Sequence, residues 1–394
     1  MPTSPSTEAG APLAGVRVLD LTRLVPGPVC TQHLADLGAD VIKIEDTAAG
    51  DAVPPKLRAL VNRNKRGIRL DLKHPDGAGA LLRLANDADV LVEGFRPGVM
   101  ARLGFGYDAL AAINPRLVYC SVTGYGQTGP DRERPGHDLN YCADAGVADQ
   151  MGNAEGPALS NVPIADLMGG ALGAAVGILA ALFDVARTGR GRHVDIAMAD
   201  GALAHAVMPL AALATHGRTK RAGHDTLTGA LACYATYRTA DDRWLAVGAL
   251  ERKFWEALCD ALERPDLKPL HRSGDADVEA RLRDELARLF ATLPLTAWQA
   301  RLRHAGGCAS PVRTLEEALA DPHFRERGMV VEGEHPTYGP VTQVASPVKM
   351  SGFEFALRRH APRPGEHTAE VLREAGFDAA TVEALIADGA AAAA

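Results

Sequence analysis

Cysteine is scarce in this chain of 394 residues, and the arrangement of the six that are present excludes two kinds of structural support. They form no CxxC motif and no Cys/His spacing of the kind that binds zinc. Most of them lie in apolar segments typical of strands or helices. The six are Cys30, Cys120, Cys142, Cys233, Cys259 and Cys308. We therefore expect reduced, buried thiols in a cytoplasmic protein, without a disulfide framework or a metal site.

Positive charge is not in excess either. The 42 Lys and Arg residues are outnumbered by 49 Asp and Glu residues, which gives a formal net charge of −7. A protein that binds nucleic acid normally carries a basic surface, so we expect no nucleic-acid partner. A local cluster of Lys and Arg can still bind an anionic small molecule, because the field near a site depends on its own charges.

Long apolar runs are almost absent. The first dozen residues have no basic stretch followed by an apolar one, so we expect no secretory signal. The one extended apolar segment, Leu167 to Phe183, is shorter than the ~20 residues that a membrane span requires. It is rich in glycine and is flanked by Asp166 and Asp184. It predicts a closely packed core helix and no membrane partner.

Short β-branched runs alternate with helical patterns in the first half of the chain. The expected strands are Val16 to Leu21, Asp40 to Glu45, Ile68 to Leu72, Asp89 to Gly94, Leu117 to Thr123 and His193 to Met198, and the expected helices between them include Cys30 to Leu37 and Gly77 to Ala88. This alternation predicts an α/β fold with a parallel sheet covered on both faces. Ligands of such sheets bind at the carboxyl ends of the strands.

A change of composition after residue 205 predicts a second domain. We expect a large domain over residues 1–205, a polar linker over 206–228, a smaller α/β domain over 229–330 and a return segment over 331–344. The terminal run Ala390 to Ala394 is expected to fray and to carry no structural role.

Glycines at 124, 126 and 129 match a G-x-G-x-x-G pattern after a strand, which is one feature of dinucleotide-binding folds. The segment from Pro130 to Pro135 follows where a helix should begin, and no fitting acidic residue ends a second strand. We therefore expect a ligand-lining loop and no NAD site.

His137 and Asp166 are two proton carriers of unlike type, each placed where a loop passes into a helix. Histidine titrates near neutrality, and burial raises the pKa of an aspartic acid toward it. Such a pair can remove a proton from one face of a carbon and return one to the other, as a racemase does. Taken singly, each residue also fits a structural position at a helix start, where Asp138 and Asp166 would act as caps.

Many motifs in a constant order resemble family III CoA-transferases (CaiB/BaiF), which include carnitine and formyl-CoA transferases and α-methylacyl-CoA racemase. The matching segments are Leu13 to Leu21, Pro26 to Pro28, Leu37 to Glu45, Leu70 to Lys73, Glu93 to Val99, Arg102 to Gly104, Gly124 to Pro130 and Gly365 to Thr368. The segment Gly136 to Tyr141 resembles the racemase branch, whereas the formyl-CoA transferase branch lacks the histidine and keeps the aspartate as a nucleophile.

This resemblance implies an overall architecture and a set of site residues. The large domain would be Rossmann-like and rejoined by residues from about 345 to 394, including a helix over Thr368 to Leu385, and two chains would form an interlocked homodimer. His137 and Asp166 would be catalytic, and Glu251 of the small domain would approach the histidine from the partner chain, orient its ring and raise its pKa. Read structurally, Glu251 is an acidic residue at a helix start. The substrate would be a coenzyme A thioester, with no prosthetic group.

The CoA site implied by the resemblance is built from three short segments. Its residues would be Leu70, Asp71, Leu72, Lys73, Gly94, Phe95, Arg96, Pro97, Gly98, Arg102, Gly136, Asp138, Leu139, Asn140 and Tyr141. The charges of Lys73, Arg96 and Arg102 suit phosphate groups. The backbone N–H of Asp138, at a helix start, suits the oxyanion of an enolate.

Two departures from the family pattern concern ligand binding. Many relatives carry arginine where this chain has Asp46, and we expect Arg63, Lys65 and Arg66 as candidates to compensate. At the entrance of the small domain, Thr228 to Tyr237 lacks the proline and the aspartate of the racemases.

The expected function is therefore an acyl-CoA racemase or epimerase that inverts the 2-position of a 2-methylacyl-CoA thioester by 1,1-proton transfer through an enolate. The first alternative is a CoA-transferase that moves CoA between carboxylic acids through an anhydride on Asp166. The second is a CoA-ester-binding protein without catalytic activity.

Overall fold

The computed structural model describes residues 10–48 and 53–394. Contacts divide the chain into two compact units, and the division at His205 and Ala206 coincides with the change of composition. Unit 1 comprises the residues up to Ala145, Val162–His205 and Arg325–Ala394, and unit 2 comprises Gly146–Asn161 and Ala206–Phe324. The segment Gly146–Asn161, which we expected in the large domain, belongs to unit 2 because Gln150 donates to the Lys220 carbonyl oxygen and Gly223 packs against Ala154.

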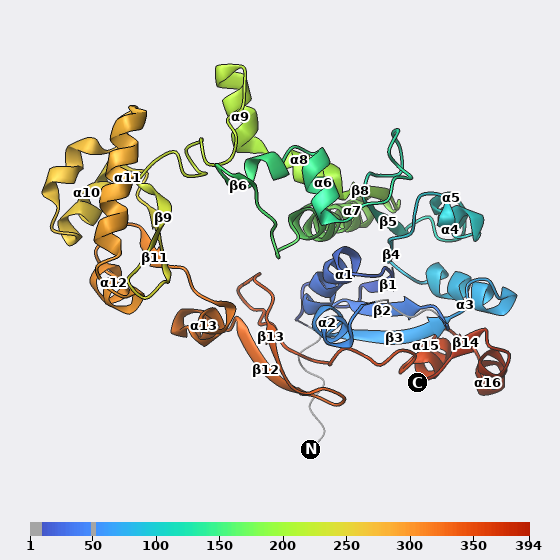
Figure 1. Cartoon of the computed structure of the whole chain (residues 1–394). Coiled ribbons are helices and arrows are strands. Elements are labelled where there is room, and N and C mark those ends of the chain that lie inside the picture. The colour runs from blue at the N-terminus through green and yellow to red at the C-terminus, as the bar shows by residue number, and fades with distance from the viewer. Residues whose placement is uncertain (1–9, 49–52) are drawn as a thin grey trace. The chain divides into compact units, whose positions relative to one another are not determined.

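Unit 1 contains a seven-stranded sheet with the order β14-β3-β2-β1-β4-β5-β8 (Figure 1). Its strands are β1 (Arg17–Leu21), β2 (Asp40–Glu45), β3 (Lys65–Leu70), β4 (Val90–Glu93), β5 (Val118–Thr123), β8 (His193–Ala197) and β14 (Ala391–Ala392). All neighbours are parallel except β14, which pairs antiparallel with β3. The predicted α/β fold with a mainly parallel sheet is confirmed.

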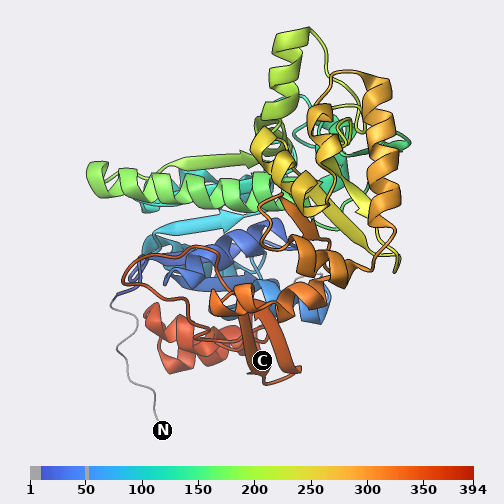
Figure 2. The same ribbon diagram turned by 90° about the vertical axis from the view of Figure 1, so that its left-hand side faces the viewer.

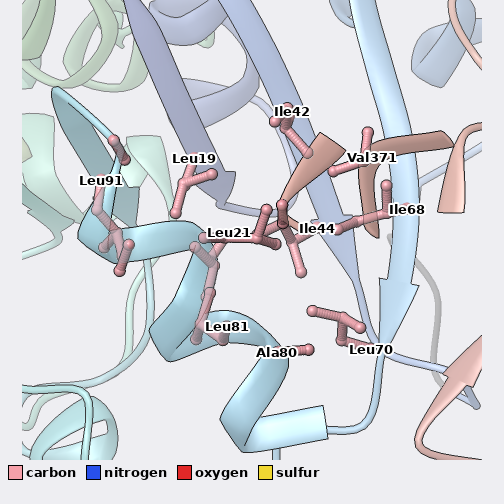
Figure 3. Close-up of a cluster of buried hydrophobic side chains, with 14 of the residues drawn as sticks. Leu19, Leu21, Ile42, Ile44, Ile68, Leu70, Ala80, Leu81, Leu91 and Val371 are labelled. Atoms are coloured by element: carbon pink, nitrogen blue, oxygen red, sulfur yellow. The ribbon is translucent and has the colours of Figure 1, made fainter. Parts of the chain in front are cut away.

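Helices cover both faces of this sheet, which explains why the residues of β1 to β5 are almost continuously buried. On one face, side chains of β1 to β4 pack against α3 (Pro75–Asn86) and α15 (Thr368–Glu374). Figure 3 shows Leu81 of α3 and Val371 of α15 directed toward this cluster, although the two helices lie far apart in the sequence. On the other face, α1 (Pro26–Asp36) and α7 (Gly173–Thr188) pack on β1, β4 and β5.

The predicted core helix begins with a π-helical segment, η2 (Ala165–Leu172), and continues as α7, which lies lengthwise along the sheet (Figure 2). Residues Ala165–Thr188 are long and apolar enough to cross a membrane by length and composition alone. Their buried face packs on the sheet, as that of a core helix does. The crossing with α8 (Met198–Ala204) requires glycine on both elements. A Cβ on Gly169 would lie 2.6 Å from the Met198 carbonyl oxygen, and a Cβ on Gly201 would lie 2.2 Å from the Gly169 Cα atom.

The C-terminal region differs from its prediction in two ways. The single helix expected over Thr368 to Leu385 is two helices, α15 and α16 (Ala379–Ala387), because Gly376 adopts a φ of +91° between them. The terminal alanines do not fray. They form edge strand β14, where Asp71 N–H donates to the Ala390 carbonyl oxygen and Thr368 Oγ1 donates to that of Ala392.

Unit 2 contains a three-stranded antiparallel sheet, β11-β10-β9, whose core packs against three helices. The strands are β9 (Tyr234–Arg238), β10 (Trp244–Gly248) and β11 (Ala309–Pro311), and the helices are α10 (Arg252–Ala261), α11 (Ala276–Phe290) and α12 (Leu295–Leu302). Trp255, Phe290 and Trp298 are fully buried there. This unit also has α9 (Val207–His216), α13 (Leu315–Ala320), η1 (Ala148–Gln150), η3 (Pro265–Leu270), β6 (Gly152–Asn153) and β7 (Gly156–Pro157).

The remaining elements connect the strands of unit 1. They are α2 (Pro55–Val61), α4 (Val99–Arg102), α5 (Tyr107–Ile113), α6 (Asp138–Asp144) and the hairpin of β12 (Val330–His335) and β13 (Gly339–Val344), while α14 (Pro322–Glu326) spans the boundary between the units. Five cysteines are buried as predicted, but Cys308 is exposed.

Candidate active site

A pocket of about 440 Å³ lies at the carboxyl ends of β1, β2 and β3, where the fold predicts a ligand. We call it the strand-end pocket. Its lining residues are Leu21, Arg23, Ile44, Glu45, Asp46, Leu70, Asp71, Leu72, Lys73, Phe95, Val99, Arg102 and Leu103. Six of the predicted CoA-binding residues, Leu70 to Lys73, Phe95 and Arg102, are therefore brought together here.

Three cations of this pocket, Arg23, Lys73 and Arg102, make no ion pair with any other residue that the structure describes. The acidic side chain of Glu45 is neutralised by Arg58, whose Nη2 lies 2.7 Å from Glu45 Oε2. The pocket thus combines unpaired cations with an apolar floor of leucine and phenylalanine side chains. This combination suits a ligand with an anionic end and an apolar body.

The basic residues that we expected to compensate for Asp46 are engaged elsewhere. Arg63 pairs with Asp36 at 2.7 Å, and Lys65 donates to buried Asp20 at 3.0 Å. Arg66 lies 2.7 Å from the Asp40 carboxylate and also contacts two glutamates. The hypothesis that these three residues replace the missing arginine is wrong, because each holds one segment of unit 1 to another.

A second pocket, of about 530 Å³, shares Arg23 and Phe95 with the first. We call it the histidine pocket because it contains His137. Its lining residues are Thr22, Arg23, Leu24, Pro26, Gly27, Gly94, Phe95, Arg96, Pro97, Val122, Thr123, Gly124, Arg132, Arg134, Pro135, Gly136, His137, Asn140, Tyr141 and Met198. The glycine-rich loop after β5 contributes Gly124 to this pocket.

The wall of the histidine pocket depends on the close packing of Tyr141. A Cβ atom at Gly124 or at Gly136 would lie 2.5 or 2.7 Å from the Tyr141 ring, so both positions require glycine. The Tyr141 hydroxyl donates to the Gly136 carbonyl oxygen at 2.5 Å. The tyrosine therefore holds the loop at Gly124 against the segment that directly precedes His137.

His137 is the N-cap residue of α6, so the helix begins where the sequence predicted. Asn140 Oδ1 accepts the backbone N–H of His137 at 3.1 Å, which fixes the start of the helix as in a capping box. Asp138 is the first residue of the helix, where backbone N–H groups have no partner within the helix. The imidazole is exposed at the pocket, beside a helix N-terminus that can stabilise an anion.

Asp166 is the second residue of η2 and does not cap it. The cap comes from the neighbouring helix, since Asp138 Oδ1 accepts the backbone N–H of Asp166 at 2.9 Å. Burial raises the pKa of Asp166 to about 6, the negative charge of Asp138 adds to this rise, and His137 opposes it. His137 and Asp166 therefore interact electrostatically within one unit.

Five predicted residues have other positions. Gly98, with a φ of +81°, is the N-cap residue of α4 and lines neither pocket. Asp138, Leu139 and the predicted catalytic residue Asp166 are not among the lining residues of the two pockets either. Glu251 belongs to unit 2, where it is the exposed N-cap residue of α10.

Two buried acids support the loops of the site, and the sequence did not point to them. Asp20 accepts from Thr22 and Thr31, both at 2.6 Å. Burial alone would raise its pKa, but Lys43 and Lys65 hold it well below its usual range. Glu93 accepts the Phe95 N–H at 2.8 Å, and burial raises its pKa to about 7.

Arg23, Arg132 and Arg134 also line the site without having been predicted. Arg23 lies 5.5 Å from the centre of the Phe95 ring and borders both pockets. Its position two residues beyond the end of a parallel strand was a signal that could have identified it. Among residues 10–48 and 53–394, no three His, Cys, Asp or Glu side chains are grouped so that they could hold a metal ion.

Comparison with known proteins places this geometry in a family. Residues 13–368 match the family model of CoA-transferase family III. The chain is 36% identical to human alpha-methylacyl-CoA racemase, with 95% of this chain and 96% of the relative covered. It is 32% identical to mouse succinyl-CoA:glutarate CoA-transferase, with 96% and 90% covered.

A solved structure of a CaiB/BaiF family protein from Brucella suis has the same fold. Its TM-score is 0.82 at 30% identity, and the match covers 93% of this chain and all of that one. Racemases and CoA-transferases occur among the relatives at similar identity, so an enzyme that acts on CoA thioesters fits them all. The chain belongs to CoA-transferase family III.

Proposed function

We propose that this enzyme is an acyl-CoA racemase or epimerase that inverts the 2-position of a 2-methylacyl-CoA thioester. The observation that carries the proposal is the pair of unlike proton carriers, His137 and Asp166, at two helix N-termini of the same unit. The pKa of Asp166, about 6, lies close to the ordinary pKa of histidine. Each group can therefore act as the base in one direction and as the acid in the other.

The substrate would bind through its CoA portion in the strand-end pocket. Coenzyme A carries phosphate groups at one end, and Arg23, Lys73 and Arg102 are cations without an ion-pair partner in the described chain. The thioester would lie in the adjoining histidine pocket, since the two pockets share Arg23 and Phe95.

The proposed reaction removes the proton from one face of the α-carbon and delivers a proton to the opposite face. The Asp166 carboxylate takes the proton from C2, and the C–H electron pair passes to the thioester carbonyl oxygen to form an enolate. The backbone N–H of Asp138, at the N-terminus of α6, would stabilise that oxygen. The His137 imidazolium then donates a proton to the opposite face of C2, which leaves Asp166 protonated and His137 neutral for the reverse reaction.

The second candidate is a CoA-transferase, and the observation that favours it is the 32% identity to succinyl-CoA:glutarate CoA-transferase. In this reaction the Asp166 carboxylate attacks the thioester carbon and CoA leaves as its thiolate. The thiolate then attacks the Asp166 carbonyl carbon of this anhydride, which releases the donor acid and leaves CoA as a thioester on Asp166. The acceptor carboxylate displaces the CoA thiolate to form a second anhydride, and the thiolate attacks the acceptor's carbonyl carbon, which gives the new acyl-CoA and frees Asp166. This route needs no proton carrier at position 137.

Heavy water distinguishes the two reactions. A racemase is expected to introduce one deuterium at C2 of a single acyl-CoA without any second acid, because each passage through the enolate allows a solvent-derived proton to return. Mass spectrometry of a panel of 2-methylacyl-CoA esters measures this, with Asp166→Ala protein as the control. If no ester gains α-deuterium while CoA exchange depends on an acceptor acid, and hydroxylamine traps an acyl group on Asp166, the enzyme is a transferase.

We also propose that two chains form a homodimer in which Glu251 of one chain orients His137 of the other. Helix α9 supports the dimer, because it is apolar along most of its length and none of its residues is buried in the single chain. Val176 and Phe183 of α7 are likewise more than 60% exposed. Apolar surface of this extent is typical of an interface.

Mixing two impaired variants tests the shared site. A His137→Ala chain and a Glu251→Gln chain, refolded together, are expected to regain activity, because one site of each hybrid dimer then contains both intact residues. Activity of the mixture is compared with that of each variant refolded alone, and mass spectrometry of intact assemblies confirms that hybrids form. Hybrids without activity would show that Glu251 does not act across the dimer.

A further inference from the structure

Asp138 joins the two helices that carry the reacting groups. It is the first residue of α6, directly after His137, and its Oδ1 atom accepts the backbone N–H of Asp166 at 2.9 Å. This contact connects residues that lie far apart in the sequence and sets the start of η2 against the start of α6. Its other oxygen, Oδ2, accepts only a weak contact from the Cys142 thiol at 3.8 Å.

The Asp138 carboxylate makes no ion pair with any residue in the described part of the chain, so its charge acts on Asp166 without a neutralising partner. The other titratable groups on α6 that interact with Asp166 are His137, Tyr141 and Cys142. Helix α8, which packs on η2, carries the exposed Asp200.

The remaining helices that pack on η2 place no Lys or Arg near its first turn, where Asp166 lies. Helix α1 carries His33 and Asp36, and Asp36 is paired with Arg63. The charged residues of α7 are Asp184 and Arg187, both near its far end. Strand β8 also packs on η2 and carries His193 and Asp195, and the Asp195 carboxylate accepts the backbone N–H of Gln127 at 3.0 Å. The negative charge that acts on Asp166 is that of Asp138.

We propose that Asp138 is a positioning residue for Asp166, which it holds by a hydrogen bond to the backbone and keeps beside an uncompensated negative charge. This inference rests on the proposed function in one respect, namely that Asp166 is the reacting carboxyl group. Two negative charges close together favour the protonated form of one of them, so Asp138 helps Asp166 to hold a proton near neutral pH. A racemase needs this, because Asp166 must give a proton as well as take one.

A purely structural role for Asp138, as the cap of η2, would also explain the hydrogen bond to Asp166. Substitutions of Asp138 can separate this capping role from the effect of its negative charge. Asp138→Asn and Asp138→Ser remove the charge but keep a side-chain oxygen that can accept the Asp166 N–H. Asp138→Ala removes both. Asp200→Asn is the matched control, since it removes a carboxylate from the neighbouring helix at an exposed position that lines neither pocket.

The pKa of Asp166 is measured in the full chain by carbon-13 NMR of protein labelled at the aspartate carboxyl carbons, with Asp166→Asn identifying the signal. In Asp138→Asn and Asp138→Ser the pKa is expected to fall by about one unit. The acidic limb of the kcat/KM profile should move by the same amount, because it reports ionisation of the same group. Asp200→Asn should change neither the pKa of Asp166 nor the kcat/KM profile. Asp138→Ala should lower the pKa as the neutral variants do, and it should also lower kcat about tenfold, because the hydrogen bond that positions the Asp166 backbone is lost.

The inference is overturned if Asp166 of the unmodified protein titrates at the ordinary value for aspartic acid, if neither neutral variant lowers its pKa, or if Asp200→Asn lowers it equally. The first of these measurements needs no variant, so a substitution that prevents folding does not remove the test. Failure of the proposed function looks different: the NMR shifts appear as expected, but Asp166→Ala leaves the turnover of CoA thioesters intact.

Discussion

Asp166→Ala is expected to lower turnover by about 10²–10⁴, and by more if Asp166 is a nucleophile, while the fold is retained. Both candidate reactions pass through this carboxyl group, as a proton carrier in one and as an acyl acceptor in the other. The backbone N–H of Asp166, which makes the hydrogen bond to Asp138, remains in the variant. Circular dichroism and thermal unfolding check the fold, and initial rates with acyl-CoA esters measure the loss.

The same residue predicts the response to pH. The pKa of Asp166 is raised from its usual value to about 6, so the ionised form that acts as base or nucleophile is lost as the pH falls through 6. With one such group, kcat/KM should fall about tenfold between pH 7 and pH 5. Asp184→Asn, at the other end of the same continuous helix, is the control, because its exposed pair with Arg192 contributes little. A profile that is flat across this range, or an active Asp166→Ala enzyme, would contradict the assignment.

His137→Ala is expected to lower the rate of racemisation by about 10²–10⁴. Without the second proton carrier, a proton can be delivered to only one face of the enolate. The helix should persist, since Asn140 accepts a backbone N–H that alanine retains. Optical rotation or separation of the two 2-epimers of an acyl-CoA measures the effect. His304→Ala, at an exposed position of unit 2 that lines neither pocket, is the matched control.

The two faces of the substrate make this prediction more specific. In His137→Ala only Asp166 remains to exchange a proton with C2, and it reaches one face of that carbon. The variant should therefore still exchange deuterium into the epimer whose C2 hydrogen faces Asp166, and this exchange should be faster than conversion to the other epimer. Retention of full racemase activity would show that a different group serves the second face. Full CoA-transferase activity together with absent racemisation would instead identify the second candidate function.

Local patterns in the sequence were sufficient for the sheet and for the position of His137. Runs such as Val18 and Leu19 in β1 are apolar at consecutive positions because both faces of a parallel strand are covered, and that requirement is visible in a few residues. The break of Pro135 and Gly136 before a helical segment likewise predicted where α6 begins. Strand ends then indicated the loops of the strand-end pocket, because all parallel strands end at one edge.

The partners of polar groups could not be read from the sequence, since they depend on which distant segments meet. Nothing near Asp166 indicates that its cap comes from Asp138. The sequence shows no partner for Arg66, but in the structure this residue forms ion pairs with Asp40 and with Glu370 of α15.

The alanines at the end of the chain show the same division most simply. Their composition carries no pattern, and they form a strand only because β3 presents an open edge and Thr368 and Asp71 offer hydrogen bonds to it. The sequence by itself thus determined three things: the parallel sheet, the family to which the chain belongs and the residue types of the candidate site. Only the tertiary structure decided which charges are paired and which remain unpaired at the site, because side-chain pairing is set by long-range packing that local periodicity does not encode.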